Sequence, residues 1–203
     1  MWAPASADWK ADGEFIGGSD EDGGGRWQLS TNVPERWAMK RPSPGGEVSF
    51  WANNTPFRHL GFFPDMGGQF DWLASRIKPG DRVMNMFGYT GVGSLIAARA
   101  GAQVTHVDAS KKSVAQAREN AALSGMADRP IRWIVDDAAK FAAREVRRGK
   151  RYDGIILDPP KFGRGPEGEV WRLEEHLAPL VGDCRLLLDA DSRFLFLTVY
   201  AVR

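Results

Sequence analysis

The stretch NMFGYTGVG at residues 85–93 decides the fold, because it joins an apolar, strand-like segment to a segment of small residues typical of a helix. Gly88, Gly91 and Gly93 carry no Cβ, so the backbone can turn sharply and approach a bound ligand. The start of the following helix offers N–H groups to a carboxylate or phosphate. A tight turn with close helix packing explains these glycines equally well, and their G-x-x-G-x-G spacing differs from the dinucleotide pattern G-x-G-x-x-G.

Around this turn, strand-like and helical segments alternate along the chain. We expect strands at residues 82–87, 103–109, 131–137, 152–158 and 193–202. We expect helices at residues 66–77 and with starts near Gly91, Ser110, Ala138 and Glu167. This alternation predicts an α/β fold with a doubly wound, mostly parallel sheet that helices cover on both faces.

The N-terminal part has a different pattern, with five of the eight tryptophans in the first 51 residues. Short strand-like pieces at residues 26–31, 36–41 and 47–52 are separated by Gly and Pro turns. We therefore predict a small β-rich extension over residues 1–56, followed by the α/β domain over residues 57–203. The segment GGSDEDGGG at residues 17–25 is too polar to pack and is expected to be a mobile loop.

Composition excludes several classes of protein. Lys and Arg number 27 against 26 Asp and Glu, so the net charge does not indicate a nucleic-acid partner. The single cysteine, Cys184, cannot form an internal disulfide and fits a reducing compartment. The start MWAPASAD lacks signal-peptide regions, and no apolar run could cross a bilayer, so we expect a soluble, cytoplasmic protein without a membrane partner. The three histidines show no metal spacing, and we predict no metal.

Acidic residues follow the second and third strands of the α/β domain. In doubly wound sheets, ligands bind beyond the carboxyl ends of the strands. Asp108 lies about 20 residues after Gly88, where a carboxylate accepts ribose hydroxyls, although Asp108 or Ser110 could simply cap the next helix. Of Asp136 and Asp137, one would contact the adenine and the other would cap the next helix, and we favour Asp137 for the adenine contact.

The segment DPPKF at residues 158–162 follows the fourth strand. Two prolines fix φ and remove two donors, which leaves backbone carbonyls free. Asp158 and the Pro159 carbonyl can then accept two hydrogen bonds from one N–H₂ group, and Phe162 can stack on a flat base. A strand that ends in a stiff turn is the plainer interpretation, but the preceding acid favours an acceptor site.

Together, NMFGYTGVG, THVDAS, VDDA and LDPPKF resemble the class I S-adenosylmethionine-dependent methyltransferases. They are most similar to the bacterial large-subunit ribosomal RNA methyltransferases, over about residues 57–203. The resemblance implies a Rossmann-like fold, S-adenosylmethionine as cofactor and a base in ribosomal RNA as acceptor. It implies these cofactor-binding residues: Asn85, Phe87, Gly88, Tyr89, Thr90, Gly91, Gly93, Asp108, Ala109, Ser110, Asp136, Asp137 and Ala138, with Phe63 of HLGFFPDM as a roof. It implies these acceptor-site residues: Asp158, Pro159, Pro160, Lys161 and Phe162.

Three departures from the family pattern shape the prediction. Relatives that methylate cytosine C5 use a cysteine thiolate to attack the base at C6, and in the most similar of them this cysteine lies at the end of the fifth strand. Here that strand reads LTVYA, and Cys184 lies in the preceding helix as a small buried hydrophobe, so a nitrogen acceptor is favoured by elimination. Amino-directed relatives usually place an aromatic residue directly after the prolines, whereas Lys161 stands here. The usual sheet also continues beyond its fifth strand, so we expect the C-terminal edge of the sheet to be missing here. Either the chain is a fragment or that edge is completed in another way.

Two rival functions remain, a nicotinamide-dependent oxidoreductase and a non-catalytic RNA-binding module with the same fold. The glycine spacing and the DPPK turn argue against the oxidoreductase. The basic residues Arg144, Arg147, Arg148, Lys150 and Arg151 are interpreted as a solvated helix end, where cations complement the helix dipole. Arg164 is a better candidate for a phosphate contact, because it follows Phe162 in a glycine loop.

Overall fold

A computed structural model describes residues 10–17, 25–56 and 59–199. Its contacts divide the chain into two compact units, Met1–Ala38 with Trp51–Phe63 and Met39–Phe50 with Pro64–Arg203. The division therefore differs from the predicted boundary after residue 56, because residues 39–50 belong to the α/β unit. Most of the predicted loop GGSDEDGGG lies outside the described residues.

The α/β unit is built on a five-stranded sheet in the order β11-β8-β5-β6-β7, and every neighbouring pair is parallel. The strands are β5 (Arg82–Met86), β6 (Gln103–Asp108), β7 (Ile131–Val135), β8 (Gly154–Leu157) and β11 (Phe194–Leu197). All five were predicted, and the structure ends each of them earlier. Strand β5 has β6 on one side and β8 on the other, which makes it the topological switch point of the sheet.

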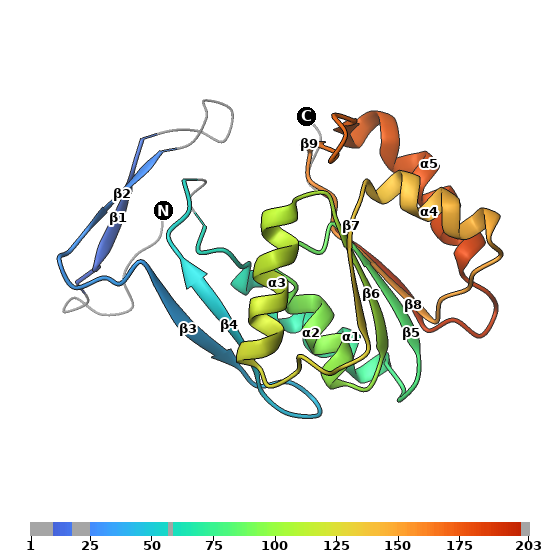
Figure 1. Cartoon of the computed structure of the whole chain (residues 1–203), viewed down its shortest axis with the longest axis horizontal. Helices are drawn as coiled ribbons and strands as arrows, with labels where there is room; N and C mark the ends of the chain where they lie inside the picture. Colours follow the sequence, from blue (N-terminus) through green and yellow to red (C-terminus); the bar gives the residue numbers. More distant parts are fainter. Residues whose placement is uncertain (1–9, 18–24, 57–58, 200–203) are drawn as a thin grey trace. The chain divides into compact units, whose positions relative to one another are not determined.

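Helices cover both faces of this sheet, as predicted for a doubly wound fold (Figure 1). They are α1 (Gly67–Arg76), preceded by the short helix η1 (Pro64–Met66), then α2 (Val92–Arg99), α3 (Lys111–Leu123), α4 (Ala138–Arg147) and α5 (Leu173–Leu187). Helix α2 packs against α1 and α3, whereas α4 and α5 pack against each other on the other face. No described helix is long and apolar enough to span a membrane.

The start of the last helix differs from the prediction. A helix was expected from near Glu167, but α5 begins at Leu173. The intervening residues form an antiparallel hairpin of β9 (Phe162–Arg164) and β10 (Val170–Arg172). Its turn contains Gly168 at φ 92°, a conformation that disfavours helix continuation. The hairpin also buries Trp171, which contacts the ring of Phe87 at 4.8 Å between centroids.

The core between the sheet and the α4–α5 layer explains why the strands read as near-continuous apolar runs. All four residues of β8 are buried, as are the last four of β5. Met84, Met86 and Leu157 pack there with Phe141 of α4. Cys184 belongs to the same core and is fully buried, which confirms its interpretation as a small hydrophobe.

The N-terminal region is β-rich, as predicted. Strand β1 (Gly13–Ile16), which was not predicted, pairs antiparallel with β2 (Arg26–Leu29), and β3 (Arg36–Arg41) pairs with β4 (Val48–Asn53). The Phe15 and Trp27 rings meet edge to face at 5.4 Å, and Trp27 Nε1 donates a hydrogen bond to the Thr55 carbonyl. Trp27 therefore serves a small local core.

Candidate functional site

The turn between β5 and α2 has an unusual backbone. Phe87 and Tyr89 have φ values of 56° and 48° and are the only non-glycine residues with positive φ in the part of the chain that the structure describes. Such conformations are costly and are often retained at functional sites. A Cβ at Gly88 would lie 2.5 Å from the His106 ring, and one at Gly91 would lie 2.7 Å from Ala117 Cβ. Close packing therefore requires both glycines, and a ligand contact at the turn stays a prediction.

A buried hydrogen-bond network supports this turn from below. Asn85 Nδ2 donates to Ser94 Oγ at 2.8 Å, and Ser94 Oγ lies 3.0 Å from His106 Nδ1. Burial lowers the pKa of His106 to about 3, so its imidazole is neutral. Asn85, predicted as a cofactor contact, is 4% exposed, and its amide nitrogen is engaged by Ser94. The sequence analysis did not identify Ser94 or His106, although polar residues inside apolar segments were a usable signal.

The first turn of α2 offers donors at the same place. Its N-cap is Gly91, at φ 81°, and no side chain of the described residues caps it. The first N–H groups of a helix have no partner within the helix, and they carry the positive end of its dipole. This terminus therefore suits an anionic group.

Asp108 ends β6 beside the turn. Its Oδ2 accepts a hydrogen bond from the Tyr89 N–H, and its Oδ1 accepts one from the Ser110 N–H, both at 2.8 Å. Burial raises the pKa of Asp108, and the two N–H groups oppose that rise. The cap of α3 is Ser110, whose Oγ accepts from the Ser113 N–H. Asp108 therefore holds the glycine turn in place, and each of its oxygens retains a lone pair for a further donor.

The two aspartates after β7 have separate roles. Asp137 caps α4, because its Oδ1 accepts a hydrogen bond from the Lys140 N–H at 2.9 Å. Asp136 forms an ion pair with Arg144. The adenine contact had been favoured for Asp137, and the cap for the other residue, but the structure gives the cap to Asp137. Ala138, another predicted contact, is the first residue of α4 and is buried.

Asp158 follows β8 directly and is only partly buried. Thr198, just beyond β11, donates a hydrogen bond from its hydroxyl to Asp158 Oδ1. Burial raises the pKa of Asp158, the Thr198 hydrogen bond lowers it, and the charge of Asp65 raises it further. Thr198 was not predicted, because residues so far apart in the chain meet only when β8 and β11 pair.

The rest of the DPPKF segment is held by the β9–β10 hairpin. The Pro160 carbonyl accepts a hydrogen bond from Trp171 Nε1 at 2.7 Å, so the expectation of free carbonyls is wrong for this residue. The Lys161 carbonyl accepts from the Leu173 N–H at 3.0 Å. Phe162 is 53% exposed, and the guanidinium of Arg164 lies 6.0 Å from the centre of its ring. The hairpin thus presents an aromatic face and a cation next to Asp158.

The strand register brings these groups to one edge of the sheet. Met86 of β5 pairs with Val107 of β6 and with Leu157 of β8. The glycine turn, Asp108 and Asp158 follow these paired residues directly, so they lie at the carboxyl ends of three adjacent strands. Phe63 lies in the other compact unit, so its predicted role as a roof stays a prediction. The described residues contain no group of three or more His, Cys, Asp or Glu side chains that could hold a metal ion.

Several known proteins are similar to this chain in sequence or in structure. A family model described as "Conserved hypothetical protein 95" matches residues 67–173. A crystal structure of a SAM-dependent methyltransferase from Agrobacterium tumefaciens superposes with a TM-score of 0.87 and 47% identity, over 95% of this chain and 61% of that one. Two proteins named ribosomal RNA large subunit methyltransferase I are similar over shorter segments. That of Shewanella denitrificans is 40% identical over 44% of this chain, and that of Shewanella amazonensis is 36% identical over 56% of it. The chain spans 23% and 26% of the length of these two relatives.

Proposed function

Because this chain belongs to the family described as Conserved hypothetical protein 95, we propose that it is an S-adenosylmethionine-dependent methyltransferase that modifies a base in ribosomal RNA. The observation that carries the proposal is the alignment of the glycine turn, Asp108 and Asp158 at the ends of three adjacent strands. The Agrobacterium relative, a SAM-dependent methyltransferase, supports the cofactor, and the Shewanella relatives support the acceptor. We also propose a cytoplasmic location, because ribosomal RNA is the proposed acceptor.

The residues at this edge fit the three parts of the cofactor. The uncapped first turn of α2 would hold the methionine carboxylate, and Asp108 would accept the ribose hydroxyls. Asp136 would face the adenine through its Oδ1, because Arg144 pairs with Oδ2, while Asp137 caps α4. When bound, S-adenosylmethionine supplies a methyl group that its sulfonium already activates. The protein then needs to align the acceptor and exclude water, and it needs no strong base.

The acceptor would be held by the segment after β8. Asp158 and the Pro159 carbonyl accept hydrogen bonds from an exocyclic N–H₂ group and direct its lone pair. The exposed face of Phe162 stacks on the base, while Arg164 is placed for a backbone phosphate.

A nitrogen acceptor is favoured over cytosine C5 by the state of the single cysteine. Cys184 is fully buried in the α5 layer, and burial raises the pKa of its thiol to about 12. A neutral, buried thiol is a poor nucleophile. This chain therefore offers no thiolate for the covalent route to C5.

The test separates cofactor binding from methyl transfer. The Asp158→Ala variant should bind S-adenosylhomocysteine within about twofold of the wild type, yet lose methyl transfer by about 100-fold or more, because a group that orients the acceptor is removed. Titration calorimetry measures binding, and tritiated methyl groups traced across RNA and protein fractions measure transfer and its acceptor. Asp128→Ala, an exposed aspartate in a loop, is the control and should change neither quantity.

Three results would contradict the proposal. Undiminished methyl transfer by Asp158→Ala would remove the assigned role of that residue. Label in the protein fraction alone would exclude RNA as the acceptor. Binding of NADH without binding of S-adenosylhomocysteine would favour the oxidoreductase instead.

A further inference from the structure

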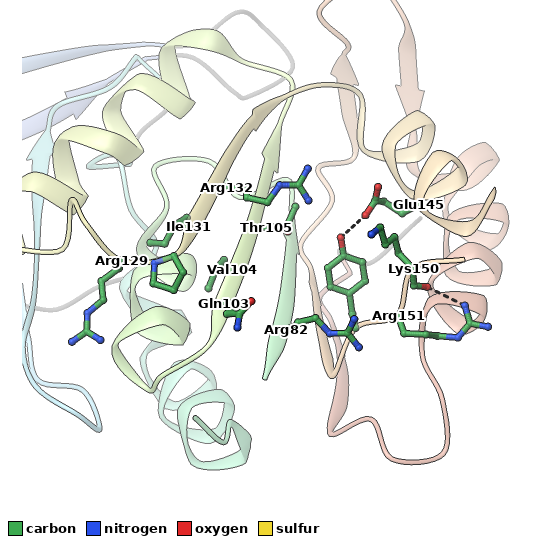
Figure 2. A pocket seen from close by; sticks show the side chains of 12 residues that line it. Arg82, Gln103, Val104, Thr105, Arg129, Ile131, Arg132, Glu145, Lys150 and Arg151 are labelled. Atoms are coloured by element: carbon green, nitrogen blue, oxygen red, sulfur yellow. Dashed lines mark hydrogen bonds between the residues drawn. The ribbon is translucent and has the colours of Figure 1, made fainter. Parts of the chain in front are cut away.

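The amino edge of the same sheet contains a basic pocket that the proposed reaction does not use. Its volume is about 340 Å³. The walls come from the beginnings of β5, β6 and β7 and from the segment between α4 and β8. Five of the lining side chains are cations: Arg82, Arg129, Arg132, Lys150 and Arg151. Figure 2 shows Lys150 and Arg151 on the right, Arg82 and Arg132 near the middle and Arg129 apart on the left.

The two acidic groups at this pocket already have hydrogen-bond or ion-pair partners. Glu145 is the one acidic residue in the pocket lining and is 2% exposed. It accepts hydrogen bonds from Tyr152 Oη at 2.8 Å and from Arg148 Nη1 at 3.1 Å (Figure 2 shows the first). Asp153 interacts with Arg82, by accepting its backbone N–H and through a 3.7 Å ion pair. These contacts leave most of the positive charge in the pocket without compensation.

The remaining cations have no acidic partner in the described part of the chain. No ion pair within 4.0 Å joins Arg129, Arg132, Lys150 or Arg151 to a described carboxylate. Arg151 Nη1 donates only to the Lys150 carbonyl at 3.0 Å, among its described contacts. Uncompensated cations gathered in a concave site attract an anion, and guanidinium groups match phosphate oxygens in geometry.

We propose that this basic pocket binds backbone phosphates of the RNA acceptor, at a segment remote from the modified base. Gln103, Val104 and Thr105 line the pocket and stand three to five residues before Asp108 on β6, so this wall lies roughly 10–17 Å from Asp108. A separate phosphate contact would strengthen RNA binding without touching the reacting atoms. The inference rests on the proposed function for the identity of the polymer, and on the pocket alone for the phosphate contact.

The test compares two double variants with the same change in charge. Arg132→Gln/Lys150→Gln removes two pocket cations, while Arg118→Gln/Arg185→Gln removes two exposed cations from α3 and α5, outside the pocket. Fluorescence anisotropy with a labelled single-stranded RNA should show about tenfold weaker binding for the pocket variant than for the control. The plot of log K against log salt should become less steep by about 1.4, because RNA binding releases fewer counterions when two phosphate contacts are lost.

Kinetic and competition measurements distinguish the alternatives. The pocket variant should raise KM for RNA, while kcat and the affinity for S-adenosylhomocysteine stay at wild-type values. Equal RNA affinity of the two double variants would overturn the inference, even if methyl transfer is confirmed. Inorganic pyrophosphate that binds the pocket tightly at constant ionic strength, with no displacement of RNA, would also overturn it and indicate a small phosphorylated ligand. If RNA binding depends on the pocket but no methyl is transferred, the proposed function fails and the phosphate contact stands.

Discussion

The two edges of the parallel sheet carry opposite chemistry. At the carboxyl edge, Asp108 and Asp158 accept defined hydrogen bonds from Tyr89, Ser110 and Thr198. At the amino edge, the cations of the basic pocket have few protein partners in the described chain. Groups that are already oriented suit one small molecule of fixed shape, whereas cations without acidic partners can bind the phosphates of a variable polymer. If both proposals hold, one sheet would separate cofactor chemistry from RNA attachment.

The largest effect is expected when Asp108 at the carboxyl edge is replaced. Asp108→Ala should weaken binding of S-adenosylhomocysteine by about 100-fold, because it removes acceptors for the ribose and for the Tyr89 and Ser110 N–H groups. Calorimetric titration measures the affinity, and Asp108→Asn, which keeps one acceptor oxygen, should lose less. The pocket variant Arg132→Gln/Lys150→Gln serves as the control from the other edge. If it lost as much cofactor affinity as Asp108→Ala, the separation of the two edges would be wrong.

A smaller effect is expected when the hydrogen bond from Thr198 to Asp158 is removed. Thr198→Val should lower kcat by about tenfold, because the Asp158 carboxylate loses the hydrogen bond that orients it. The Thr198 hydroxyl lowers the pKa of Asp158, so its removal raises that pKa, and the acid limb of the pH–kcat profile should move to higher pH. Thr198→Ser should restore both. A variant whose kcat falls with an unchanged profile would show that Thr198 acts on structure alone.

The smallest effect concerns the amino edge. Tyr152→Phe removes the hydroxyl that donates to buried Glu145 and should lower the free energy of unfolding by about 1–3 kcal/mol. Burial and the Glu145 hydrogen bond raise the pKa of Tyr152 to about 12, so the hydroxyl is a neutral donor throughout the usual range. Urea denaturation measures the loss, and cofactor affinity should not change. Wild-type stability of the variant would mean that the hydrogen bond contributes nothing.

The predicted fold was accurate where local pattern sufficed. The apolar strands and the start of α4 follow from hydrophobic runs and from the preceding acids. The prediction failed at residues 162–172, because the β9–β10 hairpin is stabilised by a contact between Trp171 and Phe87, which belong to different elements. The glutamates at 167, 169, 174 and 175 favour a helix until that burial is known.

The candidate site was predicted less completely than the fold. The sequence predicted Asp108 and Asp158 as candidates, since an acid directly after an apolar strand is visible as a pattern. It assigned the α4 cap to the wrong aspartate, because the cap depends on which carboxylate points to the Lys140 N–H, and the adenine contact stays a prediction. It also missed Ser94 and Thr198, whose partners lie on neighbouring elements.

The sequence by itself determined the alternating strands and helices, the glycine turn and the acids at the strand ends, because periodicity, backbone freedom and proline stiffness are local properties. Only the tertiary structure decided which carboxylate caps a helix and which hydroxyl orients Asp158. It also decided that Arg82, Arg132 and Lys150 surround one pocket. These cations stand far apart in the chain, and only the parallel pairing of the strands brings them to the same edge of the sheet.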